Sequence, residues 1–305
     1  MEKRVPKSRR LARRLLLVLL ITVLLIVLAI FGISGYAAYS MTATTRVPIT
    51  QTPAEFGIKY SDISFQSTDG LTLRGWWLEG SQDRSVIIMV HGSDINRADP
   101  SIKMLDIAAQ LVSHGYNVLM FDLRGHGESE GTHISAGYFE KRDVLGAVNY
   151  ALQKGMNEIG VLGYSMGAAS SLMAAPESQD IKAVVADSSY ADLEEIINYQ
   201  FSRRSSLPRF FIPIILFMDK AMYGIDFKAV KPVESVKSAV CPVFIIAGGQ
   251  DDTVTTDQAQ RLFQSSRSPQ SQLWIVPEAK HTGSYIARPQ EYIEKVESFF
   301  DAALK

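Results

Sequence analysis

Residues 159–175 read IGVLGYSMGAASSLMAA. The apolar run Ile159–Leu162 is typical of a strand buried on both faces, and the Ala- and Met-rich residues after it predict a helix. Between them lies a G-x-S-x-G motif centred on Ser165. The turn from strand to helix is tight, so Gly163 and Gly167 must lack bulk, and the serine hydroxyl is raised above the sheet edge at a helix N-terminus. This stretch predicts a nucleophilic serine in an α/β fold.

The alternation of strand and helix continues on both sides of this stretch. Period-2 patterns joined by Asp69-Gly70 predict an antiparallel hairpin at the start of a sheet. We therefore predict an α/β domain over residues 61–305, with a mostly parallel sheet of about eight strands and helices on both faces. The predicted strands are 61–67, 71–78, 86–90, 118–121, 159–162, 183–186, 243–247 and 273–276, and the helical patterns lie at about 101–114, 139–154, 166–175, 256–266 and 289–304.

One connection in this pattern is too long for a simple crossover. More than 50 residues separate the strands at 183–186 and 243–247, where about a dozen would suffice. Within this connection, residues 190–236 include the apolar stretch LPRFFIPIILF. We predict a helical lid insertion here, over the carboxyl edge of the sheet. The alternative is that this apolar stretch contacts a membrane. Two prolines interrupt it, so such contact would be limited to the membrane surface and would not span the bilayer.

Composition places the body of the chain among globular proteins. Of its 305 residues, 47% are hydrophobic and 21% charged, which excludes disorder and permits a large core. Residues 1–14 hold seven basic side chains against one acidic, so the rest is net acidic and poorly suited to nucleic-acid phosphates. The single cysteine, Cys241, precludes an intramolecular disulfide and is expected to be buried packing.

The segment after the basic tail is apolar enough to span a membrane. No charged residue occurs from Leu15 to Thr45, and about 20 apolar residues cover the ~30 Å hydrocarbon layer. We predict a basic cytoplasmic tail (1–14), a single-pass transmembrane signal anchor (15–40) and a stalk (41–60). The positive-inside rule places the N-terminus in the cytoplasm and the following domain outside it. A cleaved signal peptide is the alternative, although its apolar region is usually shorter.

A serine nucleophile needs a base, and the base needs an orienting carboxylate. Ser165 is followed in the chain by Asp251, just past one buried strand, and by His281, just past the last. The order serine, acid, histidine is the one that this architecture uses. Asp251 fits a G-x-x-D-x-x-V spacing, whereas Asp252 is expected to be a loop residue. We predict Ser165, Asp251 and His281 as a catalytic triad.

Four other histidines compete for the role of base. His114 ends a helical pattern and His133 lies in a polar loop, so both are expected at the surface. His91 and His126 precede Ser165 in the chain, and we expect them to shape turns near the site.

The attacked carbonyl becomes an oxyanion, which preorganised N–H groups stabilise by about 3 kcal/mol each. One donor is expected to be the backbone N–H of Met166, directly after the nucleophile. The second is expected from the loop after Val90, where we select the backbone N–H of Ser93.

From about Ile63 to Phe300 the chain resembles the α/β-hydrolase superfamily. The residues that carry the resemblance stand in family order: His91-Gly92, the D-x-R-G-x-G-x-S stretch from Asp122 to Ser129, the motif at Ser165, then Asp251 and His281. That stretch is similar to serine aminopeptidase-like and lipase-like hydrolases, many of which carry an N-terminal signal anchor.

The resemblance also assigns supporting roles. It implies that Asp122 and Arg124 support the floor of the active site and are structural. Thr255 stands where relatives often have proline, and Lys280 replaces a common glycine before the histidine. Neither departure removes a catalytic group.

The sequence thus predicts a membrane-anchored serine hydrolase that cleaves an ester, thioester or amide bond of a small-molecule or lipid-like acyl substrate. No histidine cluster has metal-ligand spacing, and no dinucleotide or phosphate-binding motif is intact, so we predict no metal and no other cofactor. An aminopeptidase of the same fold is one alternative, with Glu194 or Glu195 holding the free amine of the substrate. A non-catalytic, surface-anchored binding module is another.

Overall fold

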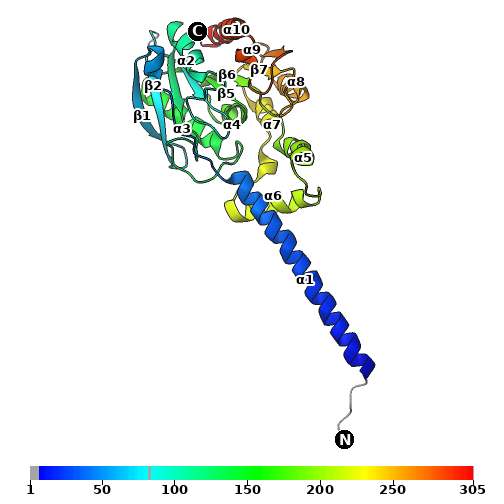
Figure 1. Cartoon of the computed structure of the whole chain (residues 1–305). Coiled ribbons are helices and arrows are strands. Elements are labelled where there is room, and N and C mark those ends of the chain that lie inside the picture. The colour runs from blue at the N-terminus through cyan, green and yellow to red at the C-terminus, as the bar shows by residue number, and fades with distance from the viewer. Residues whose placement is uncertain (1–6, 82–83, 305) are drawn as a thin grey trace.

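The computed structural model describes residues 7–81 and 84–304. An eight-stranded sheet lies at its centre in the order β1-β2-β4-β3-β5-β6-β7-β8 (Figure 1). Strand β2 runs antiparallel to both of its neighbours, and β3 to β8 run parallel to one another. The eight predicted strands are confirmed as β1 (Tyr60–Gln66), β2 (Thr72–Leu78), β3 (Ser85–Val90), β4 (Asn117–Phe121), β5 (Glu158–Tyr164), β6 (Ile181–Asp187), β7 (Val243–Gly248) and β8 (Gln272–Val276).

Helices cover both faces of this sheet, as the buried strands require. One apolar cluster joins the sheet to α3, α4, α7 and α8, and a second joins the other face to α2 and α10. The helices are α1 (Lys7–Thr42), α2 (Met104–Ser113), α3 (Glu140–Gln153), α4 (Met166–Ala174), α5 (Leu193–Arg204), α6 (Phe211–Tyr223), α7 (Pro232–Ser238), α8 (Thr256–Ser265), α9 (Ser284–Ala287) and α10 (Pro289–Ala303). The fold class predicted from the sequence is confirmed.

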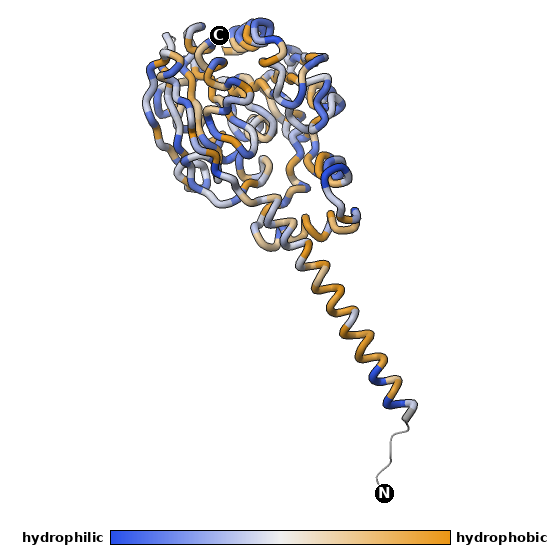
Figure 2. Tube along the Cα trace, viewed as in Figure 1, coloured by the Kyte–Doolittle hydropathy of each residue, from blue (hydrophilic) through white to orange (hydrophobic). Residues whose placement is uncertain are grey.

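Helix α1 is one long apolar helix that projects away from the domain (Figures 1 and 2). Its Leu, Ile and Val side chains from Leu15 to Leu28 are 42–62% exposed. It is the one helix of the described residues that is long and apolar enough to cross a membrane. The helix extends beyond both ends of the predicted anchor at 15–40, and residues 1–6 of the predicted basic tail lie outside the described residues.

The predicted stalk, residues 41–60, packs against the domain as a strap. Arg46 donates hydrogen bonds to the backbone carbonyls of Gly127 (2.8 Å) and Gly131 (2.9 Å). Asn96 donates from its side-chain amide to the carbonyls of Val47 and Pro48 at 3.1 Å each. These bonds tie the strap to two loops of the domain, so α1 leaves the domain from a fixed point.

The insertion, residues 190–236, is helical as predicted, and its helix α6 packs on two other helices. On one side, Ile212 and Leu216 of α6 belong to an apolar cluster with Ala169 of α4. On the other side, Ile215 of α6 packs with Ala38 of α1. The insertion therefore links the helix that follows Ser165 to the end of α1.

Asp219 in α6 gives a testable consequence of this packing. The side chain is fully buried, and neither carboxylate oxygen has a hydrogen-bond partner among the described residues. Burial raises the pKa of Asp219 from 3.8 to about 7. The protonated form therefore suits the fold, and ionisation costs stability as the pH rises from near 4 to 7.

We expect Asp219→Asn to remove this cost. Thermal unfolding of the full chain in detergent should show the variant and the wild type alike near pH 4. At pH 8 the variant should be more stable, by on the order of 2 kcal/mol. Equal stability at both pH values would contradict the expectation.

Candidate active site

Ser165 lies on a strained turn between β5 and α4. Its backbone angles are φ 50° and ψ −115°, a region that L-residues occupy at a cost of about 1–3 kcal/mol. Its N–H donates a hydrogen bond to the carbonyl of Asp187 at the end of β6 (2.9 Å). The turn thus directs the hydroxyl away from the sheet edge and holds it there.

The two glycines of the motif have no room for a side chain. A Cβ on Gly163 would lie 2.6 Å from the carbonyl oxygen of Gly167. A Cβ on Gly167 would lie 2.4 Å from the carbonyl oxygen of Val90, which ends the neighbouring strand β3, and 2.3 Å from that of His91, which follows it. Because the obstacles are backbone atoms, the prediction that both positions must lack bulk is confirmed.

The three predicted residues of the triad meet at the carboxyl edge of the sheet. His281 Nε2 lies 2.8 Å from Ser165 Oγ, and His281 Nδ1 lies 2.7 Å from Asp251 Oδ2. The three residues come from the loops that follow β5, β7 and β8. Serine, imidazole and carboxylate therefore form one hydrogen-bonded chain, with the carboxylate beside Nδ1 and the hydroxyl beside Nε2.

The loop backbone directs Asp251, and not Asp252, toward His281. Asp251 Oδ1 accepts hydrogen bonds from the N–H groups of Thr253 and Val254, both at 2.8 Å. These bonds leave Oδ2 directed at His281, and the side chain of Asp251 is 1% exposed. Asp252 is exposed to solvent instead.

Two residues that the sequence analysis did not select hold the histidine loop. The hydroxyl of Ser188 donates to Asp187 Oδ1 and accepts the N–H of Thr282, both at 2.9 Å. Burial raises the pKa of Asp187 to about 6, against the lowering effects of the Ser188 hydroxyl and of His281. The available signal was the polar run Asp187-Ser188-Ser189 directly after a buried strand.

Of the two residues selected as oxyanion donors, Ser93 lines a small cavity beside Ser165, and Met166 directly follows Ser165 in the chain. This cavity has a volume of about 240 Å³ and is lined by Ser93, Asp94, Ser165 and His281, among others. Met166 is the first residue of α4, so its N–H has no acceptor within the helix. The positions of both residues suit the roles predicted for them, and the roles themselves remain predictions.

The loop that carries Ser93 is held by two buried histidines. His91 Nε2 accepts the N–H of Leu123 (3.0 Å), so Nδ1 carries the proton and donates to the carbonyl of Gly92 (2.6 Å). His126 Nε2 accepts the N–H of Asp94 (3.2 Å) in the same way. Burial lowers the pKa of His91 well below its usual range, and the nearby His126 adds to this effect. These bonds support the expectation that both histidines shape the turn.

The other predicted placements divide into two groups. His114 is exposed beside Glu297 and Asp301, and Cys241 is buried with the pKa of its thiol raised to about 11 by burial; both predictions are confirmed. His133 is only partly exposed. Its ring is half-buried, 4.3 Å from that of Tyr223, because the insertion folds back onto this loop.

Asp122 and Arg124 are structural, as the resemblance implied. Asp122 accepts hydrogen bonds from the backbone and guanidinium of Arg97, and Arg124 pairs with Asp143 and Asp69. These buried ion pairs brace the loop that carries His126.

Glu194 and Glu195, the expected anchors for a substrate amine, have other partners. Glu195 pairs with both terminal nitrogens of Arg261, and Glu194 lies 3.3 Å from Lys228. Neither is among the described residues that line the cavity beside Ser165.

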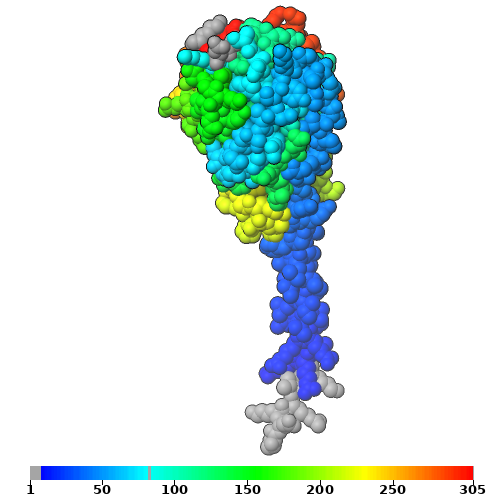
Figure 3. Space-filling view, turned by 90° about the vertical axis from the view of Figure 1, so that its left-hand side faces the viewer, coloured from blue at the N-terminus to red at the C-terminus, as the bar shows by residue number. Residues whose placement is uncertain are grey.

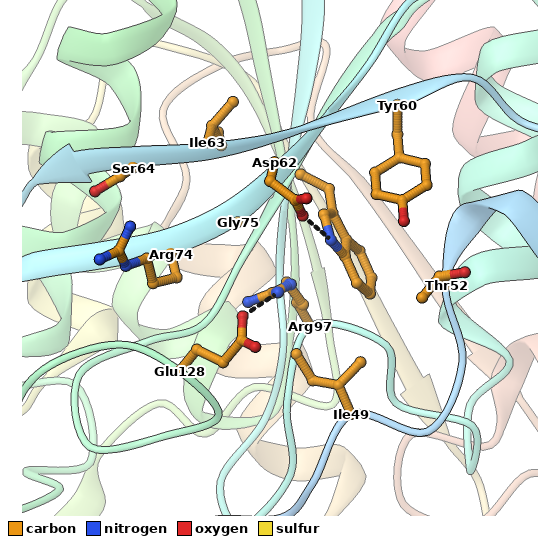
Figure 4. A pocket seen from close by; sticks show the side chains of 11 residues that line it. Ile49, Thr52, Tyr60, Asp62, Ile63, Ser64, Arg74, Gly75, Arg97 and Glu128 are labelled. Carbon is orange, nitrogen blue, oxygen red and sulfur yellow. Dashed lines mark hydrogen bonds and ion pairs between the residues drawn. The ribbon is translucent and has the colours of Figure 1, made fainter.

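A larger cavity, of about 680 Å³, lies elsewhere, beside β1 and β2 (Figure 4). Four of its lining side chains already bind one another in pairs: Trp76 donates to Asp62 (3.0 Å), and Arg97 pairs with Glu128 (2.6 Å). The lining residues include no serine–histidine pair. Among residues 7–81 and 84–304, no group of three or more His, Cys, Asp or Glu side chains is arranged to hold a metal ion.

Comparisons with known proteins agree with this architecture. Residues 81–212 match the family described as serine aminopeptidase, S33. The chain is similar to the Pyrococcus furiosus esterase Pf2001, with a TM-score of 0.73 and 26% identity, over 86% of this chain and all of that one. The chain belongs to the α/β-hydrolase superfamily.

Two relatives of this α/β hydrolase cover most of its length. The uncharacterized protein YqkD of Bacillus subtilis is 29% identical over 240 residues, 77% of each chain. Protein bem46 of Schizosaccharomyces pombe is 24% identical over 254 residues, 80% of this chain and 77% of that protein. The chain is thus a hydrolase-family protein related to esterases.

We expect Gly167→Ala to destabilise the fold, because the added methyl group meets the backbone of β3 and not a side chain that can move. A loss of about 1–3 kcal/mol is typical of such overpacking, and thermal unfolding in detergent measures it. Gly32→Ala is the control, since a Cβ there has open space within 4 Å. Equal stability of the Gly167→Ala variant and the wild type would contradict the expectation.

Proposed function

We propose that this chain is a membrane-anchored serine hydrolase that cleaves carboxylic esters through an acyl-enzyme. The observation that carries the proposal is the hydrogen-bonded chain from Ser165 through His281 to Asp251, in which Ser165 and His281 line a cavity at the carboxyl edge of the sheet. In open α/β sheets this edge is where ligands bind.

The arrangement supports a two-step reaction. In the first step the Ser165 hydroxyl attacks the ester carbonyl while His281 Nε2 takes its proton, and Asp251 stabilises the imidazolium that forms. The backbone N–H groups of Met166 and Ser93 stabilise the oxyanion. His281 then returns the proton to the leaving alcohol. In the second step water attacks the acyl-enzyme by the same route and frees the acid and the serine.

An ester fits the site better than a peptide with a free amino end. The two carboxylates expected to hold such an amine are paired with Arg261 and Lys228. The similarity to an esterase at 26% identity points the same way. Aminopeptidase activity is the second candidate, because the matching family is described by that activity.

The proposed anchor is α1, with the N-terminus in the cytoplasm and the domain outside. Its exposed apolar surface supports a helix that spans a membrane and argues against a stalk that lies in water. An uncleaved anchor is favoured over a signal peptide by packing. Ala38, in the small-residue stretch Ala38-Tyr39-Ser40 that could serve for cleavage, is fully buried against the insertion, so a protease would have to open that contact.

We expect a fluorophosphonate probe to label the full chain in detergent and to leave Ser165→Ala unlabelled, because only an activated serine reacts with the probe. The labelled protein should hydrolyse p-nitrophenyl acyl esters faster than aminoacyl anilides. Ser165→Ala should lose both activities.

Labelling that persists in Ser165→Ala would contradict the assignment of the nucleophile. No labelling of the wild type would favour a binding module. Faster hydrolysis of the anilides would make the chain an aminopeptidase.

The pair Asp251→Asn and Asp252→Asn separates the two neighbouring carboxylates. Loss of the acid leaves the histidine in the wrong tautomer, which lowers kcat by about 10⁴-fold in a serine protease. We expect a loss of several orders of magnitude in kcat for Asp251→Asn. Asp252→Asn, the matched control, should stay close to wild type, and the reverse result would overturn the assignment.

A further inference from the structure

We infer that helix α6 of the insertion is a second membrane contact, seated at the boundary between acyl chains and headgroups. This inference rests on the proposed anchoring by α1 and extends it to the domain itself. The occupant of the exposed face of α6 is therefore a lipid surface.

The outer face of α6 is apolar and exposed. Phe210, directly before the helix, is 54% exposed, and Phe217 is 60% exposed. Pro213 and Ala221 are exposed as well. Positions 210, 213, 217 and 221 are spaced by three or four residues and so share one side of the helix. The opposite side is occupied, because Ile212, Ile215 and Leu216 are buried.

The height of α6 along α1 identifies what meets this face. A Cβ placed on Gly35 of α1 would lie 3.4 Å from Cε of Met218, so α6 crosses α1 at that level. Twenty residues separate Gly35 from Leu15, where the uncharged run begins. At 1.5 Å per residue this is about 30 Å, the thickness of the hydrocarbon layer. Helix α6 therefore lies where α1 leaves the hydrocarbon.

The space-filling view agrees with this placement. The yellow atoms, which include α6, lie at the foot of the domain beside the emerging α1 (Figure 3). Helix α6 and the emerging α1 thus lie side by side at the foot of the domain.

Charge around α6 suits a headgroup layer. Arg203 and Arg204 end α5, Arg209 lies just before α6, and all three are exposed. Basic side chains close to a membrane surface are attracted to anionic lipid headgroups. Asp219, the acidic residue of α6, is buried, so the exposed surface of this fully described helix carries no negative charge.

A second contact has a mechanical consequence. The strap and α1 alone would fix one point of the domain on the membrane and allow it to tilt. With α6 also seated, the carboxyl edge of the sheet keeps one orientation toward the lipid surface. A lipid-like acyl substrate would then approach the cavity beside Ser165 from a defined side.

Depth-dependent fluorescence quenching tests the inference on the full chain. Single cysteines are introduced in a Cys241→Ser background, labelled with a small fluorophore and reconstituted into phosphatidylcholine–phosphatidylglycerol vesicles. The vesicles carry a spin label either at the headgroup or deep in the acyl chain. Phe217→Cys reports on α6, and Leu24→Cys reports on α1. Val240→Cys is the exposed apolar control (80% exposed), because it precedes β7 and so lies at the amino ends of the parallel strands, away from their carboxyl edge.

We expect the headgroup label to quench Phe217→Cys, the deep label to quench Leu24→Cys, and neither to quench Val240→Cys. Quenching at Leu24 with none at Phe217 would overturn the inference and leave the anchor intact. No quenching at Leu24 would overturn the anchor itself, whatever the fluorophosphonate result. Disulfide cross-linking of two copies of unlabelled Phe217→Cys, with no quenching of the labelled form, would also overturn it and assign the face to self-association.

Discussion

The site depends on one steric constraint, the contact between the backbone of the Ser165 turn and the backbone that ends β3. Gly167 approaches the carbonyls of Val90 and His91 so closely that no side chain fits. This contact brings α4 against the sheet directly after the serine. It also places the loop after β3, with Ser93, next to the serine hydroxyl. Nucleophile and the proposed oxyanion donors are thus positioned by the same few atoms.

Buried polar groups then hold the remaining loops at this edge. His91 and His126 bond the loop that carries Ser93, and Asp187 with Ser188 bonds the loop that carries His281. A buried polar group without a partner costs free energy, so each satisfied bond favours one loop geometry over others. The precision of the triad distances is therefore a property of the loops and not of the three side chains alone.

The N-terminal part of the chain is coupled to this edge as well. The strap binds the loop that carries His126 through Arg46, and the insertion packs on both α4 and α1. The proposed anchor therefore contacts elements that border the site.

The sequence by itself determined the features that depend on local pattern. Apolar runs predicted the eight strands, the glycines around Ser165 predicted the tight turn, and the order of Ser165, Asp251 and His281 indicated the proposed triad. The length of the uncharged run after Leu15 indicated a helix able to span a bilayer. Each of these depends on residues close together in the chain or on a spacing that the chemistry imposes.

Only the tertiary structure decided the supporting contacts. Ser188 and Thr282 are 94 residues apart, Arg46 and Gly131 are 85 apart, and no local pattern marks either pair. The packing of α6 on α1 was equally impossible to predict, since the sequence pattern of an apolar helix is the same whether the helix covers a substrate, a neighbouring helix or a lipid. Which surface it meets is set by the path of the whole chain, because burial is decided by what the fold brings alongside.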